Sequence, residues 1–296
     1  ADYYYIEALM RWKKIRAGQS LSEANKFMHP GILHTKESLE RMKYYVDHRI
    51  EPAYSSYRLL EADSCALSTY QMQGPFEVIA RLGVNKHTKR PSEDDHKAAY
   101  LNALMWTLTG DEAHARKSIE ILNAYSAMLK LIGPNDNDDP LCASLQGSML
   151  ANAAELIKHT YSKVTPAEIA GWEKMLRTVF IPVLDTFFKA KPYTNGNWGA
   201  AATKAYMAFG IFLEDEALYN QAVHFYYNGH DNGTIKNYIG ENGQCQESGR
   251  DQDHVMFGLG NLAEACETAY NQGDEKMYAA FDNRLLTGYE YTAKYN

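Results

Sequence analysis

Apolar residues recur along most of this chain at spacings of three and four, the period of an α-helix. In the stretch from Ser144 to Tyr161 the apolar positions are Leu145, Met149, Leu150, Ala153, Leu156, Ile157 and Tyr161. Such a stripe packs one face of a helix against a neighbour. Alternating β-branched residues form no run long enough to predict a sheet. The pattern therefore predicts an all-α chain.

Capping signals add helix boundaries to this pattern. Thr109 and Thr165 each stand three residues before a glutamate, and Thr165 is followed by proline at the first helical position. With the periodicity, they predict helices at roughly 36–60, 98–109, 111–131, 145–162, 166–189, 198–213, 215–227, 251–272 and 275–296.

Polar segments at 133–140, 191–197 and 228–246 separate these helices. The last is long for a connection in a compact helical domain, and long loops often carry functional residues. No internal repeat of fixed period and no Pro/Ser/Gly-rich linker divides the chain. We therefore expect one domain of successive helical hairpins over residues 1–296.

Composition narrows the class of protein. The chain has 296 residues, of which 45% are hydrophobic, which is enough for a substantial core. Its net charge of -7 argues against nucleic-acid binding, which needs a basic face. The most apolar stretch, 200–213, is interrupted by Thr203, Lys204 and Tyr206, so no membrane span is expected and the protein should be soluble.

Several kinds of chemistry lack their sequence motifs. The four cysteines, Cys65, Cys142, Cys245 and Cys266, form no C-x-x-C pair. The aspartates near Asp138 do not follow the calcium-loop spacing, which favours a solvated turn, and there is no H-E-x-x-H, phosphate-binding glycine loop or G-x-S-x-G. We predict no catalytic metal and no cofactor. The 22 tyrosines offer flat faces with a hydroxyl, a side-chain type that suits carbohydrate clefts.

The densest polar cluster runs from Gly243 to His254, at the start of an apolar helix. Ser248, three residues before Asp251, predicts a capping box, with Arg250 in the first turn and His254 one turn later. Arginine in a first turn opposes the helix dipole, so it calls for an anionic ligand or an acidic partner such as Glu247. Two readings stay open: a catalytic pair, or an ion pair with His254 capping a neighbouring carbonyl.

A second cluster, 193–200, combines asparagines with an aromatic residue. Asn195 and Asn197 are both natural N-caps for the helix that follows. Beside Trp198 their carboxamides could also hold a sugar ring and hydrogen-bond its carboxylate. The choice between capping and binding depends on whether this loop faces Arg250.

Five segments together resemble a known family over nearly the whole chain. They are His29-Pro30-Gly31-Ile32-Leu33-His34-Thr35, Gly74-Pro75-Phe76, Asn195-Gly196-Asn197-Trp198, the run from Gln244 to His254, and the run from Asn283 to Asn296. They look like the alginate-lyase superfamily of polysaccharide lyases. The resemblance implies an (α/α) toroid, an incomplete barrel of helical hairpins. It also implies β-elimination of a uronic-acid polysaccharide, usually alginate, by a secreted or periplasmic enzyme.

The chain departs from the family pattern at two positions. Better-known members carry an asparagine followed directly by histidine in the loop that contains Asn197 and Trp198, and a tyrosine seven residues after the arginine, where this chain has Phe257. Related domains also continue beyond the position of Asn296. We therefore expect a C-terminal continuation, which could hold a catalytic tyrosine.

β-Elimination needs a neutraliser for the uronate carboxylate, a base and an acid. We predict that Arg250, with Asn195 or Asn197, neutralises the carboxylate and that His254 removes the proton, since histidine titrates near neutral pH. Tyr291 on the closing helix is the predicted acid. The same reasoning predicts that the two polar segments meet across one cleft. Further predicted residues are Tyr289 and Tyr295 as alternative acids, and Trp198, Glu247, Gln252, Tyr193 and Tyr289 as substrate-binding groups.

Other functions remain open from sequence alone. A glycoside hydrolase on a similar toroid would use two carboxyl groups, for example Glu247 with Asp251 or Asp253. A catalytically silent sugar-binding scaffold would use the same aromatic and asparagine loops without reaction. The expected partner is an anionic polysaccharide, and a cleft that binds it can be locally basic although the whole chain is acidic.

Overall fold

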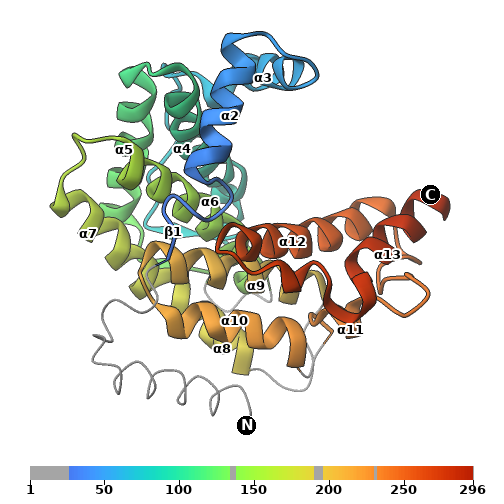
Figure 1. The fold of residues 1–296 in the computed structure, drawn as a ribbon. Helices are drawn as coiled ribbons and strands as arrows, with labels where there is room; N and C mark the ends of the chain where they lie inside the picture. Colours follow the sequence, from blue (N-terminus) through green and yellow to red (C-terminus); the bar gives the residue numbers. More distant parts are fainter. Residues whose placement is uncertain (1–26, 134–137, 190–195, 230–231, 296) are drawn as a thin grey trace, which may run out of the picture.

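Helices make up almost all the regular structure of the computed structural model, which describes residues 27–133, 138–189, 196–229 and 232–295 (Figure 1). The all-α prediction is confirmed. The helices are α2 (Lys36–Asp47), α3 (Ala53–Ala62), α4 (Lys89–Thr109), α5 (Glu112–Met128), α6 (Asp139–Thr160), α7 (Pro166–Met175), α8 (Ile181–Lys189), α9 (Gly196–Phe212), α10 (Glu216–Asn228), α11 (Ile235–Tyr238), α12 (Gln252–Asn271) and α13 (Ala280–Tyr295).

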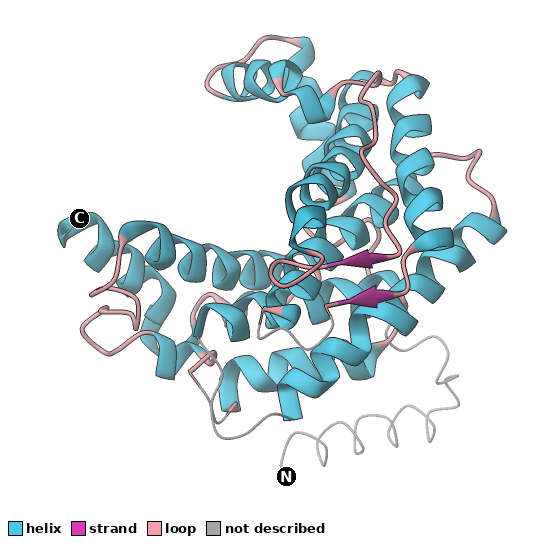
Figure 2. Ribbon diagram, turned by 180° about the vertical axis from the view of Figure 1, so that it is seen from behind, coloured by secondary structure: helices cyan, strands magenta, loops and turns pink. Residues whose placement is uncertain are grey.

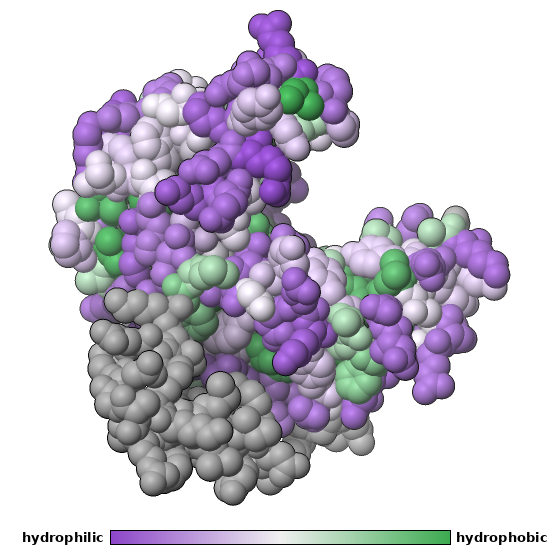
Figure 3. Space-filling view, viewed as in Figure 1, coloured by the Kyte–Doolittle hydropathy of each residue, from purple (hydrophilic) through white to green (hydrophobic). Residues whose placement is uncertain are grey.

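Consecutive helices pack as hairpins around the central pair α6 and α9. The α4 helix lies against α5 and α6, and α9 lies against α6, α10 and α12. A Cβ added at Gly147 of α6 would stand 2.6 Å from the Phe209 ring of α9, so glycine permits this close approach. Seen from behind, the α4–α5 group and the α12–α13 group are set at an angle (Figure 2), and an open notch separates the α2–α3 projection from α12–α13 (Figure 3).

Two short strands interrupt the helical pattern. β1 (Val78–Ile79) and β2 (Leu131–Ile132) pair in parallel, with Val78 opposite Leu131 and Ile79 opposite Ile132. Two residues are too few for alternation to reveal a strand in the sequence. Because the strands are parallel, the segments that follow them leave at the same edge of the pair.

The expected helix boundaries are confirmed in part. The Thr165 capping box is present, with Pro166 in the first turn. The N-cap predicted at Thr109 is wrong, because Asp111 caps α5 and Gly110 ends α4 in the left-handed conformation, with a φ of 72°. The expected 36–60 helix is two helices, since the chain turns at Arg49, whose φ is 53°, before Pro52 opens α3.

Other differences concern where helices begin or change. The α4 and α6 helices begin earlier than expected, at Lys89 and Asp139, and a π-helical segment, Leu176–Phe180, joins α7 to α8. The expected 228–246 loop contains α11 and an antiparallel bridge between Ile239 and Cys245. Three-residue 3-10 helices occur at Ser64–Ala66, Lys86–Thr88 and Glu275–Met277.

The four cysteines are buried and free, as expected for isolated core thiols. They belong to the cluster of apolar side chains that fills the space between the helical hairpins. Within the described ranges, no helix combines the length and the apolar character that crossing a lipid bilayer demands.

Candidate active site

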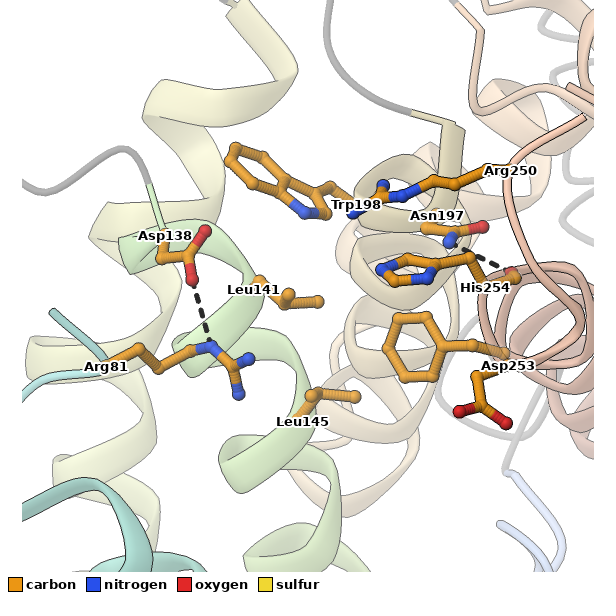
Figure 4. Close-up of a pocket in the computed structure, with 10 residues that line it drawn as sticks. Arg81, Asp138, Leu141, Leu145, Asn197, Trp198, Arg250, Asp253 and His254 are labelled. Atoms are coloured by element: carbon orange, nitrogen blue, oxygen red, sulfur yellow. Dashed lines mark hydrogen bonds and ion pairs between the residues drawn. The ribbon is translucent and has the colours of Figure 1, made fainter. Parts of the chain in front are cut away.

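A pocket of about 500 Å³ lies where the first turns of α6, α9 and α12 converge (Figure 4). Asn197 and Trp198 come from one predicted segment, and Arg250 and His254 come from the other. The prediction that these segments meet at one cleft is therefore confirmed. The described lining residues are Arg81, Asp138, Leu141, Leu145, Asn197, Trp198, Arg250, Asp253, His254 and Phe257.

Asp251 both starts helix α12 and orients His254. Its carboxylate accepts a hydrogen bond of 2.8 Å from the His254 backbone N–H, and both its oxygens lie 2.7 Å from His254 Nδ1. These hydrogen bonds hold the pKa of Asp251 below its usual range. With Nδ1–H donating to the carboxylate, Nε2 keeps its lone pair for a proton from another group.

The predicted capping box at Ser248 is wrong. Asp251 is the N-cap, and Ser248 instead accepts a hydrogen bond of 3.0 Å from the Cys245 N–H. Arg250 therefore precedes the helix and does not oppose its dipole from the first turn. Its predicted partner is confirmed, since Arg250 Nη1 lies 3.5 Å from an oxygen of the buried Glu247 side chain, and its Nε lies 3.7 Å from Asp251.

Asn197 links three helices beneath the pocket. It is buried inside the first turn of α9, not at the N-cap. Its Oδ1 accepts a hydrogen bond of 2.6 Å from the Tyr238 hydroxyl, and its Nδ2 donates one of 3.0 Å to the His254 carbonyl. A Cβ at Gly258 would stand 1.8 Å from the Tyr238 hydroxyl, so only glycine at this position of α12 admits the arrangement.

Arg81 and Asp138 form a wall of the pocket that the sequence did not predict. Arg81 Nε lies 3.2 Å from Asp138 Oδ2, and its Nη1 lies 3.0 Å from Glu93. The expectation that the aspartates near Asp138 form only a solvated turn is wrong for Asp138. Arg81 follows β1 and Asp138 follows β2, so the strand pair brings them together. A basic residue two positions after an apolar pair was the available signal, but it is too common to single out.

The rest of the pocket is largely apolar. Trp198 packs against the hydrophobic core while lining the pocket, and Figure 4 shows Leu141 and Leu145 between Arg81 and His254. Phe257 lies where the family pattern has tyrosine. Among the described lining residues, Arg81 and Arg250 carry two positive charges, and Asp138 and Asp253 carry two negative charges. The pocket is therefore balanced in formal charge and not strongly basic.

The remaining predicted residues are not among the described residues that line the pocket. Gln252 is exposed, and Tyr289 and Tyr291 lie on α13; none of these is among the described lining residues. The Tyr291 ring lies 4.6 Å from that of Tyr295, centroid to centroid. Tyr193 and Asn195 lie outside the described residues. The roles given to these residues stay predictions.

A toroid of helical hairpins, with an arginine and a carboxylate-oriented histidine at one pocket, is the arrangement expected of a helical polysaccharide lyase. A family model described as alginate lyase matches residues 71–296. The chain therefore belongs to the alginate lyase family and is a polysaccharide lyase. Comparison with curated proteins gives no match.

Solved structures of alginate lyases share the fold. One from Bacteroides ovatus has a TM-score of 0.69 at 14% identity, over 90% of this chain and 84% of its own. Alginate lyase A1-III from Sphingomonas species A1 has a TM-score of 0.67 at 13% identity, over 86% and 75%. A variant of A1-III complexed with tetrasaccharide has a TM-score of 0.62 at 17% identity, over 87% and 78%. These likenesses confirm the helical toroid.

Proposed function

We propose that this lyase cleaves a uronic-acid polymer by β-elimination, with alginate as the first candidate substrate and glucuronan as the second. The observation that carries the proposal is the His254–Asp251 pair beside Arg250 in one pocket. The family model and the tetrasaccharide complex of alginate lyase A1-III support a polysaccharide that contains uronate.

In the proposed reaction, His254 Nε2 takes the proton on the sugar carbon next to the carboxylate. Arg250 neutralises the charge that grows on that carboxylate, since a positioned cation stabilises such a transition state. The electron pair forms the C4–C5 double bond, and the bond from C4 to the glycosidic oxygen breaks. The leaving oxygen accepts a proton, so the products are an unsaturated sugar and a new chain end.

The residues that line the pocket support one source of that last proton. Phe257 has no hydroxyl, and no tyrosine is among the described residues that line the pocket. His254 carries a proton after the first step, and its ring faces the pocket (Figure 4). We therefore assign it both roles: it returns the proton to a leaving oxygen on the same face of the sugar. Tyr291, predicted as the acid from the sequence, is the alternative.

Two further residues suit a polymer. Trp198 offers an aromatic face to a sugar ring, and Arg81 lies across the pocket from Arg250 (Figure 4). We propose that Arg81 contacts the carboxylate of a neighbouring sugar unit. Asn197 accepts a hydrogen bond from Tyr238 and donates one to the His254 carbonyl. We assign it two roles: it positions His254, and it helps Arg250 to neutralise the substrate carboxylate.

The hydrolase alternative fits the geometry less well. Of its three candidate carboxylates, only Asp253 lines the pocket. Glu247 is buried beside Arg250, and Asp251 caps α12 and binds His254. A pair of carboxyl groups on either side of a glycosidic bond is therefore not formed by these residues.

The experiment is incubation with alginate, glucuronan and a neutral glycan, following ultraviolet absorbance of the conjugated product and release of reducing ends. We expect both signals on a uronate polymer and neither on the neutral glycan. Reducing ends without absorbance would indicate hydrolysis, and binding without either signal would indicate a silent scaffold; both results contradict the proposal.

A further inference from the structure

A second cluster of chemistry-bearing side chains lies far from the pocket, at the other end of α6. Glu155 and His159 stand one helical turn apart on this helix, and His29 reaches them from the segment that leads into α2. Leu145 of the active-site pocket is ten residues before Glu155, about 15 Å along the helix axis. The cluster is therefore separate from the proposed lyase site.

We propose that His29, Glu155 and His159 bind a divalent transition-metal ion of the zinc class. One ligand atom from each residue can be chosen so that all three lie within 4.8 Å of one another. His29 Nδ1 is 2.7 Å from Glu155 Oε1, and His159 Nε2 is 3.5 Å from Glu155 Oε2. Two imidazoles and one carboxylate are a ligand set that zinc accepts in proteins.

The burial and hydrogen bonding of the Glu155 carboxylate favour a bound cation. Its side chain is only 2% exposed, and Oε2 accepts no hydrogen bond among the described residues; the His159 ring, 3.5 Å away, faces it. The other oxygen contacts His29 Nδ1 and accepts a hydrogen bond of 3.2 Å from the Gly31 N–H. A buried carboxylate oxygen without a hydrogen bond is costly, and a cation between it and the His159 ring would offset that cost.

The distances suit a tetrahedral ion after a small adjustment. Zinc–ligand bonds of about 2.0–2.2 Å place neighbouring ligand atoms about 3.3 Å apart, close to the separation of Glu155 Oε2 and His159 Nε2. The His29 and His159 rings are stacked, with centroids 4.3 Å apart and planes at 8°. Because an imidazole nitrogen binds a metal in its ring plane, one ring must turn. His159, whose polar contact among the described residues is the 3.5 Å pair with Glu155, can turn while His29 keeps its contacts with Glu155 and Glu214.

Glu214 supplies a feature typical of metal-bound histidines. Its Oε1 lies 2.7 Å from His29 Nε2, the nitrogen away from Glu155. In the metal-free protein both ring nitrogens of His29 face a carboxylate at 2.7 Å. An ion would take the place of the proton on Nδ1, while Glu214 would hold the proton on Nε2. Glu214 holds a left-handed backbone conformation, with a φ of 54°, in the turn between α9 and α10.

An ion here would have a structural role. The segment 27–35 passes beside α6 and the end of α12 (Figure 1), where Gln272 donates hydrogen bonds to the carbonyls of Met28 and Gly31. A metal bound by His29 and α6 would fasten this segment to the toroid. Binding should raise the melting temperature and leave kcat unchanged at temperatures where the metal-free protein is folded.

The test is calorimetric titration of chelator-treated full chain with zinc chloride, with magnesium chloride as the comparison salt. We expect one zinc per chain and no comparable magnesium binding, since magnesium prefers oxygen ligands. His159→Gln should abolish that binding, and Glu214→Gln should weaken it about 10–100-fold. His87→Gln, an exposed histidine elsewhere, is the matched control and should bind as wild type.

Three results would overturn the proposal: no zinc binding by the wild-type chain, unchanged binding by His159→Gln, or equal weakening by His87→Gln. Cobalt substitution gives a second readout, because a tetrahedral site shows intense visible absorption that His29→Gln should remove. Circular dichroism confirms that each variant is folded. Lyase activity is not used as a readout, so failure of the lyase proposal would leave this test intact.

Discussion

At the scale of single residues, His254 depends on the carboxylate beside it. His254→Gln keeps the approximate size of the side chain but removes the proton acceptor, so we expect kcat to fall about 10²–10⁴-fold. The side chain is 39% exposed, so the folded state should change little. Turnover of the uronate polymer over a range of pH, with circular dichroism of both proteins, checks this. Near wild-type turnover with an unchanged pH profile would show that the base is another residue.

Arg250 is expected to act through charge and shape together. Arg250→Ala removes a donor to the developing carboxylate charge, and such losses typically cost about 10²–10³ in rate. Arg250→Lys should recover little, because lysine lacks the planar fork that grips a carboxylate. Arg116→Ala is the matched control, because Arg116 is exposed and its ion pair among the described residues is with Glu112 on the same helix, α5. If Arg116→Ala lowers activity as much as Arg250→Ala does, the effect is not specific to the pocket.

Substitution of Tyr291 distinguishes the two proposed sources of the proton that the leaving oxygen accepts. Since Tyr291 packs on α13 beside Tyr295, we expect Tyr291→Phe to keep kcat within about twofold if His254 returns the proton. A loss as large as that of His254→Gln would instead identify Tyr291 as the acid. Initial rates under saturating substrate decide between the two.

At the scale of elements, alanine substitutions at two glycines of α12 are expected to change stability in opposite directions. A Cβ at Gly258 would collide with the Tyr238 hydroxyl and Asn197 Oδ1, whereas a Cβ at Gly260 would meet nothing within 4 Å. Gly258→Ala should lower the free energy of unfolding by about 1–3 kcal/mol and reduce kcat, because it displaces the contacts beneath His254. Gly260→Ala should raise that free energy by about 0.5–1 kcal/mol, since alanine favours helix.

Urea unfolding and initial rates test both variants. Equal effects of the two substitutions would show that helix propensity alone matters and that the Asn197–Tyr238 contact does not position the site.

Element by element, the sequence predicted what depends on local pattern. Periodicity predicted most of the helices, and Thr165 with Pro166 predicted the start of α7, because capping involves neighbours in the chain. The expected range 251–272 agrees with α12, but its N-cap was predicted at Ser248 and lies at Asp251, because both residues are good N-caps and local preference does not choose between them. The strands β1 and β2 were missed because their pairing is a tertiary contact.

For the whole molecule, the partly buried His34 makes stability depend on pH. Burial lowers the pKa of His34 to about 4, and its Nε2 lies 2.6 Å from the Tyr100 hydroxyl. In the unfolded chain a histidine takes up a proton near pH 6.5. Below that pH the unfolded state binds a proton that the native state does not, so stability should fall as the pH drops from about 6.5 to about 4.

His34→Gln should remove this contribution, since glutamine does not titrate but can still accept a hydrogen bond from Tyr100. The free energy of unfolding, measured in urea from pH 7 to pH 4, should therefore fall less steeply in the variant than in the wild type. Parallel curves would mean that His34 does not contribute.

The active-site pocket also belongs to the whole-molecule scale. Its right-hand half in Figure 4 was predicted, because Asn197, Arg250 and His254 stand in dense polar segments. The opposite wall was not predicted. Arg81 stands alone among apolar residues, and Asp138 belongs to a polar run that was expected to form a turn. The two become neighbours only when two strands pair. Contacts of this kind depend on the assembled fold, which local pattern does not encode.

Because Asp251 has two roles, activity should be lost when the first turn of α12 opens locally. The same carboxylate closes the first turn of α12 and orients the His254 ring. When that turn frays, the base loses its orientation while the rest of the toroid stays folded. Inactivation by heat or mild denaturant should therefore precede global unfolding, and amide hydrogen exchange at the first turn of α12 should follow the loss of turnover.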